Sequence, residues 1–193
     1  MNQQEKFLDL YCFERLNSWK NIADKEKSDI ETVKNKYKSL NFYFAKHCNS
    51  TEDNIKEYFV SLKPEIDKIN SVYQKYTKDR KIGFKGFKNF YNWFIMQYEK
   101  QKGKCYYCET TEDDLKLLFQ KGVFNPKKPA WKNGTLQIEK LKPDEGYNPN
   151  YCVLACVLCN NAKSDLISDV DFKKIFAEPM KKYLQQKISN LKK

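Results

Sequence analysis

Two Cys-x-x-Cys pairs constrain this chain more than any other feature of its sequence. Cys105 and Cys108 form the first pair, and Cys156 and Cys159 form the second. Two residues between paired cysteines allow both thiolates to turn toward one point, and two such pairs supply the four sulfur ligands of a tetrahedral zinc site. The sequence therefore predicts a structural Zn²⁺ ion that ties two distant parts of the chain together.

The expected cellular location of the protein and the sequence around the two cysteine pairs favour a metal site over disulfide bonds or a redox-active dithiol. The first residues contain no apolar run of the kind that directs secretion, so we expect a cytoplasmic protein whose thiols stay reduced. No thioredoxin-like pattern surrounds either pair. Cys152 could compete for the metal but lies outside both pairs. We expect the three remaining cysteines to be small buried hydrophobic side chains, namely Cys12, Cys48 and Cys152.

The segment between the pairs predicts two short strands followed by a helix. Residues 135–141 and 151–155 are rich in apolar and β-forming residues, and a turn-rich loop separates them. We expect the helix to begin at the second cysteine pair and to end near Ser168. The predicted fold class is α+β, mainly α, with a two-stranded hairpin as its sheet.

This arrangement resembles the zinc-bound branch of the HNH (ββα-metal) endonuclease superfamily. The resemblance covers residues 84–176 and rests on the two cysteine pairs, the Gly146-Tyr147 loop and the run Cys-x-x-Cys-Asn-x-x-Lys that ends at Lys163. It implies a treble-clef-like ββα-metal unit with a closed, structural zinc site. It also implies hydrolysis of DNA phosphodiester bonds with a second cation, Mg²⁺ or Mn²⁺.

The resemblance assigns Glu139 and Asn160 as ligands of that catalytic cation. Glu139 ends the first strand, where the family usually has Asp or His, and Asn160 directly follows the last cysteine. Two oxygen ligands together with a substrate phosphate suit a hard cation that polarises the scissile group. The structural alternatives are a carboxylate on the strand surface for Glu139 and a helix cap for Asn160.

Lys140 stands where the family has its general-base histidine. A lysine is a poor base at neutral pH, because its reference pKa is about 10.4, unless neighbouring positive charges lower that pKa. Lys140 could instead hold a phosphate as a point charge. A related group of HNH-like proteins has Asp-Arg here, followed by Gly-Tyr, and Glu139-Lys140 resembles it. Activation of water could then come from the metal alone or from a loop side chain, with Asp144, Glu145 and Tyr147 as candidates.

The charge distribution favours a polyanionic partner for the zinc-containing part. The net charge is +11; residues 1–80 hold 15 basic and 13 acidic residues, and the remaining 21 basic and 12 acidic residues give net +9. We expect nucleic acid, as double-stranded DNA, to be the partner. A lysine-rich composition without a binding role is the alternative. The predicted contacts come from an irregular basic loop and the last helix of the motif, at Lys127, Lys128, Trp131, Lys132 and Lys163.

The chain is expected to divide into residues 1–80, a helical domain of unknown role, and residues 81–193, the zinc domain. Apolar periodicity predicts four helices in the first part, which could dimerise or contact a protein partner. The basic, glycine-containing stretch 78–86 is the expected boundary. Helices are predicted over 84–102, 110–121 and 169–191, and no apolar stretch approaches the length of a membrane span.

Two functions remain open from the sequence. The first is a metal-dependent DNA endonuclease, such as one used in restriction or phage defence. The alternative is a catalytically inactive HNH-like zinc module that binds nucleic acid or a protein partner. Lys140 at the histidine position favours the alternative, as does Tyr151, which aligns with the family's central asparagine. A weaker third hypothesis makes the cysteine pairs a protein-interaction element.

Overall fold

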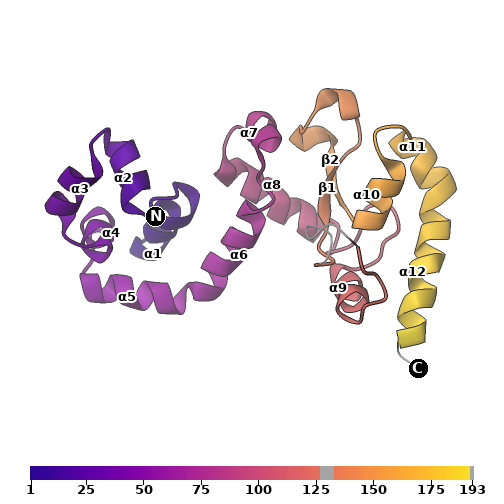
Figure 1. The fold of residues 1–193 in the computed structure, drawn as a ribbon, viewed down its shortest axis with the longest axis horizontal. Coiled ribbons are helices and arrows are strands. Elements are labelled where there is room, and N and C mark those ends of the chain that lie inside the picture. The colour runs from indigo at the N-terminus through magenta and orange to yellow at the C-terminus, as the bar shows by residue number, and fades with distance from the viewer. Residues whose placement is uncertain (127–132, 192–193) are drawn as a thin grey trace. The chain divides into compact units, whose positions relative to one another are not determined.

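The computed structural model describes residues 1–126 and 133–191, and Figure 1 shows its mainly helical architecture. The chain divides into two compact units, Met1–Gln74 and Lys75–Lys193. The first unit contains 12 basic and 12 acidic residues, so the net charge of +11 belongs entirely to the second. A two-stranded antiparallel hairpin lies in the second unit, which confirms the α+β, mainly α class.

The first unit contains more and shorter helices than the four that were predicted. Its continuous patterns at 3–20 and 26–48 are each interrupted, because Arg15, Lys27 and Lys38 adopt positive φ angles of 59°, 53° and 61°. Short polar side chains then start new helices by accepting backbone N–H groups. The helices are α1 (Gln3–Leu8) with a π-helical continuation (Asp9–Phe13), α2 (Trp19–Glu26), α3 (Ile30–Tyr37), α4 (Leu40–Cys48), α5 (Glu52–Ser61) and α6 (Lys63–Tyr73).

Aromatic rings form the core of the first unit. Phe7 is fully buried and packs edge-on against Phe44 and Phe59, at ring-centroid distances of 5.3 and 4.8 Å. The chain's one histidine, His47, stacks on Tyr43 and its Nδ1 lies 2.8 Å from the Tyr43 carbonyl oxygen. These contacts give His47 a structural role in this core.

The second unit begins with a helix where the sequence predicted a break. α7 (Lys78–Phe84) forms over the basic stretch and ends where Lys85 and Gly86 adopt φ angles of 51° and 123°. α8 (Phe87–Lys100) follows and buries its apolar face, including Phe90 and Phe94. α9 (Glu112–Gln120) forms within the predicted range 110–121 and is capped by the side chain of Thr111.

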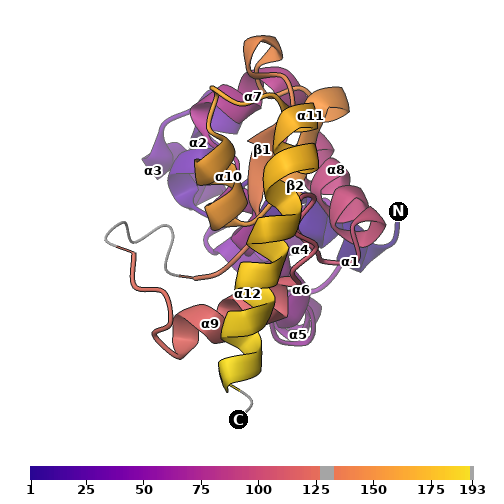
Figure 2. The same ribbon diagram turned by 90° about the vertical axis from the view of Figure 1, so that its right-hand side faces the viewer.

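The hairpin and the helix after it form the centre of the second unit. β1 (Gln137–Lys140) pairs with β2 (Cys152–Ala155), and Ile138 lies opposite Leu154. α10 (Val157–Lys163) follows at once and lies beside β1 in both views (Figures 1 and 2). It ends before the predicted Ser168, because Ser164 adopts a φ of 50°.

The last helical stretch covers the predicted range and makes contact with α9. It consists of α11 (Asp169–Asp171), a π-helical turn (Phe172–Phe176) and α12 (Ala177–Leu191). Pro179 lies within α12, just after the wider π turn, and does not split the helix. Across the described ranges, none of the helices combines the length and apolar character that crossing a membrane requires.

Candidate functional site

The four predicted cysteines converge on one point. Their sulfur atoms lie within 4.8 Å of one another, and all four side chains are buried. The sulfurs of Cys108 and Cys156 are 3.8 Å apart. A tetrahedron with a centre about 2.3 Å from each sulfur has edges of about 3.8 Å, so the spacing fits zinc. No second group of three or more His, Cys, Asp or Glu side chains meets this spacing among residues 1–126 and 133–191.

The local backbone of each cysteine pair shapes the cluster. In the first pair, the Cys105 amide donates to the Thr110 carbonyl at 2.9 Å, which closes the turn that carries both thiols. In the second, Cys156 is the N-cap of α10, and its sulfur accepts the Cys159 amide at 3.4 Å. The Cys156 amide donates to the Cys105 sulfur at 3.2 Å and links the two pairs. Such N–H···S contacts stabilise thiolates and orient them for a metal.

The electrostatics of the cluster also fit a cation. Hydrogen bonding within the cluster, that with Cys105 first, holds the pKa of Cys108 far below its ordinary value and raises the pKa of Cys156 and of Cys159. Four thiolates in so small a volume would repel one another. A divalent cation at the centre would allow all four to ionise, which is the usual requirement of a closed zinc site.

Two polar bridges join β1 to α10 beside the cluster. The Asn160 side-chain amide donates to Gln137 Oε1 at 2.9 Å, and Lys163 Nζ lies 2.9 Å from Glu139 Oε1. Residues two apart on a strand share one face, and residues three apart on a helix share one face, so both bridges belong to a single interface. Glu139 and Asn160, the two predicted cation ligands, therefore lie on the same β1–α10 interface.

The Glu139–Lys163 ion pair lies almost entirely out of solvent. The Lys163 side chain is 0% exposed and that of Glu139 is 6% exposed. Burial raises the pKa of Glu139, and the Lys163 ammonium opposes that shift. The prediction that Lys163 contacts nucleic acid does not fit this placement, because its ammonium is enclosed and already paired. The alternative of a surface carboxylate does not fit Glu139 either.

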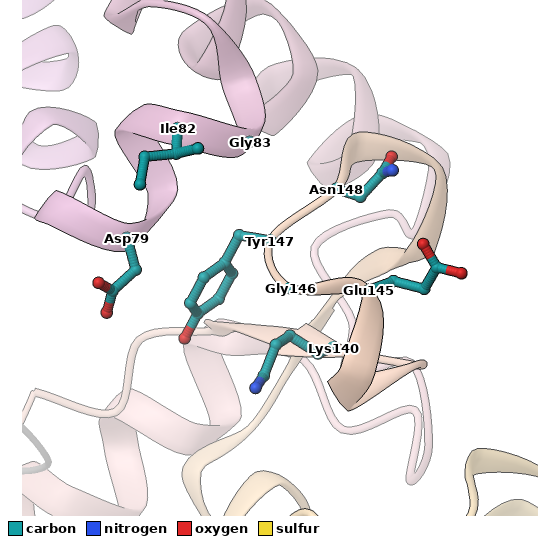
Figure 3. Close-up of a pocket in the computed structure, with 8 residues that line it drawn as sticks. All are labelled: Asp79, Ile82, Gly83, Lys140, Glu145, Gly146, Tyr147 and Asn148. Carbon is teal, nitrogen blue, oxygen red and sulfur yellow. The ribbon is translucent and has the colours of Figure 1, made fainter.

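Lys140 lies on the opposite face of β1 from Glu139, as alternation along a strand requires. Its Nζ lies 3.6 Å from a carboxylate oxygen of Asp165. Figure 3 shows Lys140 beside Tyr147, and the ring centroid of Tyr147 lies 5.7 Å from Lys140 Nζ. The structure thus separates Lys140 from the interface that holds Glu139 and Asn160. Lys140 instead lines a pocket between α7 and the loop that joins β1 to β2.

Arg80 shares the Tyr147 ring with Lys140, and a separate cation–tyrosine pair begins two residues beyond the end of β1. The Arg80 guanidinium lies 4.8 Å from the Tyr147 ring centroid, and Lys142 Nζ lies 4.1 Å from that of Tyr151. We call these five residues, Arg80, Lys140, Lys142, Tyr147 and Tyr151, the basic–aromatic surface. Sequence reasoning did not select Arg80, which fell in the expected boundary, or Lys142. The repetition of lysine at positions 140 and 142 was the available signal for the latter.

Four of the predicted nucleic-acid contacts, Lys127, Lys128, Trp131 and Lys132, lie outside the described residues. No protein-family model, curated protein or solved structure gives a significant match to this chain.

Proposed function

We propose that the second unit is an HNH-like, treble-clef-type module and that the protein is a metal-dependent endonuclease that hydrolyses DNA phosphodiester bonds. The observation that carries the proposal is the shared β1–α10 interface of Glu139 and Asn160, built directly on the four-cysteine cluster. A strand carboxylate and a helix amide are the oxygen donors that a Mg²⁺ or Mn²⁺ ion needs alongside a phosphate.

The Lys163 ammonium occupies the position on the β1–α10 interface where oxygen atoms stabilise a positive charge. It lies 2.9 Å from Glu139 and also contacts the carbonyl oxygens of Lys140 and Ser164, at 3.4 and 3.2 Å. Binding of a divalent cation by Glu139 and Asn160 requires the ammonium to move away from the carboxylate. A cation bound there would supply charge neutralisation at the scissile phosphate.

The basic–aromatic surface supports DNA as the substrate. Arg80, Lys140 and Lys142 provide charges that neutralise phosphates, and the surrounding unit holds the chain's entire net charge of +11. Lys140 would serve there as a phosphate contact and would not act as the base. A cation held by Glu139 and Asn160 would, when bound, supply the activation of the attacking water.

The test is nicking of supercoiled plasmid by zinc-loaded protein with added Mg²⁺ or Mn²⁺. Ca²⁺ replaces a chelator as the negative control, since a chelator would also remove the structural zinc. We expect nicking by the wild type and its loss in Glu139→Gln and Asn160→Ala. Glu112→Gln is the matched control, because Glu112 is another buried carboxylate paired with a lysine, Lys116 at 2.7 Å. Equal nicking by wild type and Glu139→Gln would refute this site.

A second candidate is a zinc-stabilised module that binds DNA without cutting it. The enclosure of Glu139 by Lys163, with Lys140 on the opposite face, favours this candidate. It predicts salt-sensitive DNA binding by the wild type and no nicking with either cation. The plasmid assay, combined with a binding measurement on the same preparation, separates the two candidates.

A further inference from the structure

A hollow of about 410 Å³ lies between α7 and the loop that joins β1 to β2 (Figure 3). Its volume falls within the range of roughly 300–1,000 Å³ that is usual for small-molecule pockets. Asp79, Ile82 and Gly83 line it from α7, Lys140 lines it from the end of β1, and the loop contributes residues 145–148. The hollow therefore adjoins Lys140, on the face of β1 that does not carry Glu139.

The walls of this pocket are fixed by a close approach of two backbones. A Cβ atom added at Gly83 would lie 1.4 Å from the Tyr147 carbonyl oxygen, so the loop contacts α7 at a distance that only glycine permits. The Arg80 guanidinium lies over the Tyr147 ring at 4.8 Å. The Tyr147 ring is thus held in place as one wall of the hollow.

The side chains around the pocket combine an aromatic ring, an apolar group, a carboxylate and an ammonium. Figure 3 shows Tyr147 between Asp79 and Lys140, with Ile82 above it, whereas Glu145 and Asn148 point away from the ring. Ile82 is 80% exposed and supplies the apolar edge of the pocket. An aromatic wall and an apolar edge suit a flat heterocycle.

We infer that the pocket binds one unpaired nucleobase of the DNA substrate, with the adjoining phosphate on Lys140. This inference rests on the proposed DNA-directed function. The Asp79 carboxylate would repel a phosphate inside the pocket but can accept hydrogen bonds from an exocyclic amino group. A base that is paired and stacked cannot enter, so the favoured substrate has an extrahelical or mismatched base that carries an amino group.

The test compares a fully paired duplex with a second duplex that has the same sequence except for one additional, extrahelical 2-aminopurine in one strand. Binding is measured by fluorescence anisotropy with Ca²⁺, so that cleavage plays no part, and 2-aminopurine emission reports insertion of the base. Because stacking on an aromatic side chain stabilises an inserted base, we expect wild type to prefer the bulged duplex on the order of tenfold. Tyr147→Ala should reduce the preference to near one.

Two further variants keep the test decisive. Tyr151→Ala removes a tyrosine of the same connection that does not line the pocket, and it should change affinity for both duplexes while keeping their ratio. Ile82→Glu alters an exposed side chain, so it should fold normally and still lose the preference. Equal binding of both duplexes by wild type overturns the pocket inference and leaves the proposed function standing. Absence of binding to either duplex overturns both.

Discussion

Lys163 of α10 places its ammonium 2.9 Å from the carboxylate of Glu139 on β1, and the two side chains are 0% and 6% exposed. A lysine is rarely enclosed to this degree unless it is paired. The pair joins the helix to the hairpin close to the four-cysteine cluster, so it holds together the elements on which the proposed site is built.

Removing one partner of this pair should destabilise the second unit strongly. Lys163→Met leaves the Glu139 charge buried without a partner, a change that costs about 3–5 kcal/mol in comparable pairs. Adding Glu139→Gln to Lys163→Met should recover much of that loss. Urea unfolding of the zinc-loaded proteins measures both. Lys182→Met is the control, since that side chain is 74% exposed and should change stability by less than about 0.5 kcal/mol. Wild-type stability in Lys163→Met would argue that the pair does not form in solution.

The same carboxylate should give stability a defined pH dependence. Burial raises the pKa of Glu139 above its ordinary 4.5, so folding favours the protonated form. Its contribution to the free energy of unfolding is therefore fully present below pH 4.5 and is lost as the pH rises through the folded pKa. The difference in unfolding free energy between wild type and Glu139→Gln isolates this effect, because the four clustered cysteines are present in both proteins. A difference that grows in favour of wild type as the pH rises would contradict the prediction.

The sequence was most informative where chemistry and periodicity coincide. The convergence of the four cysteines and the hairpin at residues 137–155 could both be predicted from spacing and residue type. Helix breaks in the first unit could not, because Arg15, Lys27 and Lys38 adopt positive φ angles that non-glycine residues rarely adopt. The apolar pattern simply continues across them.

The sequence does not predict which lysines are buried and which are accessible. Lys163 and Lys140 look alike as cationic residues near a motif, yet one is enclosed and the other lies beside a pocket. Burial depends on which strand face meets α10, and that depends on the register of β1 with β2. The closeness of α7 to the Tyr147 loop likewise arises from tertiary packing of a segment predicted as a break.

Metal binding should depend on the four clustered cysteines and on no fifth one. Native mass spectrometry should find one Zn²⁺ per chain, and Co²⁺ substitution should give the absorption of a tetrahedral thiolate site. Cys159→Ser should lose the ion and unfold the second unit, because structural zinc supplies folding free energy directly. Cys152→Ser is the matched control, since Cys152 is buried on β2 but lies outside the cluster. Loss of zinc in Cys152→Ser alone would reassign the ligands.

DNA affinity should fall steeply as the salt concentration rises. Each lysine that contacts a phosphate should contribute to the slope of log K against log salt concentration. A lysine that contacts one phosphate reduces the slope of log K against log salt by about 1 when it is removed. We expect this for Lys142→Ala, which removes an exposed cation of the basic–aromatic surface. Lys20→Ala, an exposed lysine of the electrically neutral first unit, should leave the slope unchanged. Identical slopes for wild type and Lys142→Ala would remove this surface from the DNA interface.

Gly83→Ala should disturb the pocket more than any change to the exposed side of α7. The added methyl group would lie 1.4 Å from the Tyr147 carbonyl oxygen, so either α7 or the loop must move. Forced overpacking of this kind costs about 1–3 kcal/mol. Urea unfolding measures the loss, and amide chemical shifts of residues 145–148 report displacement of the loop. Ile82→Ala, at the adjacent and exposed position, is the control and should keep both stability and shifts near those of wild type. If Gly83→Ala matched the wild type in both measurements, the backbones of α7 and the loop would not approach each other this closely in solution, and the pocket would have no fixed wall.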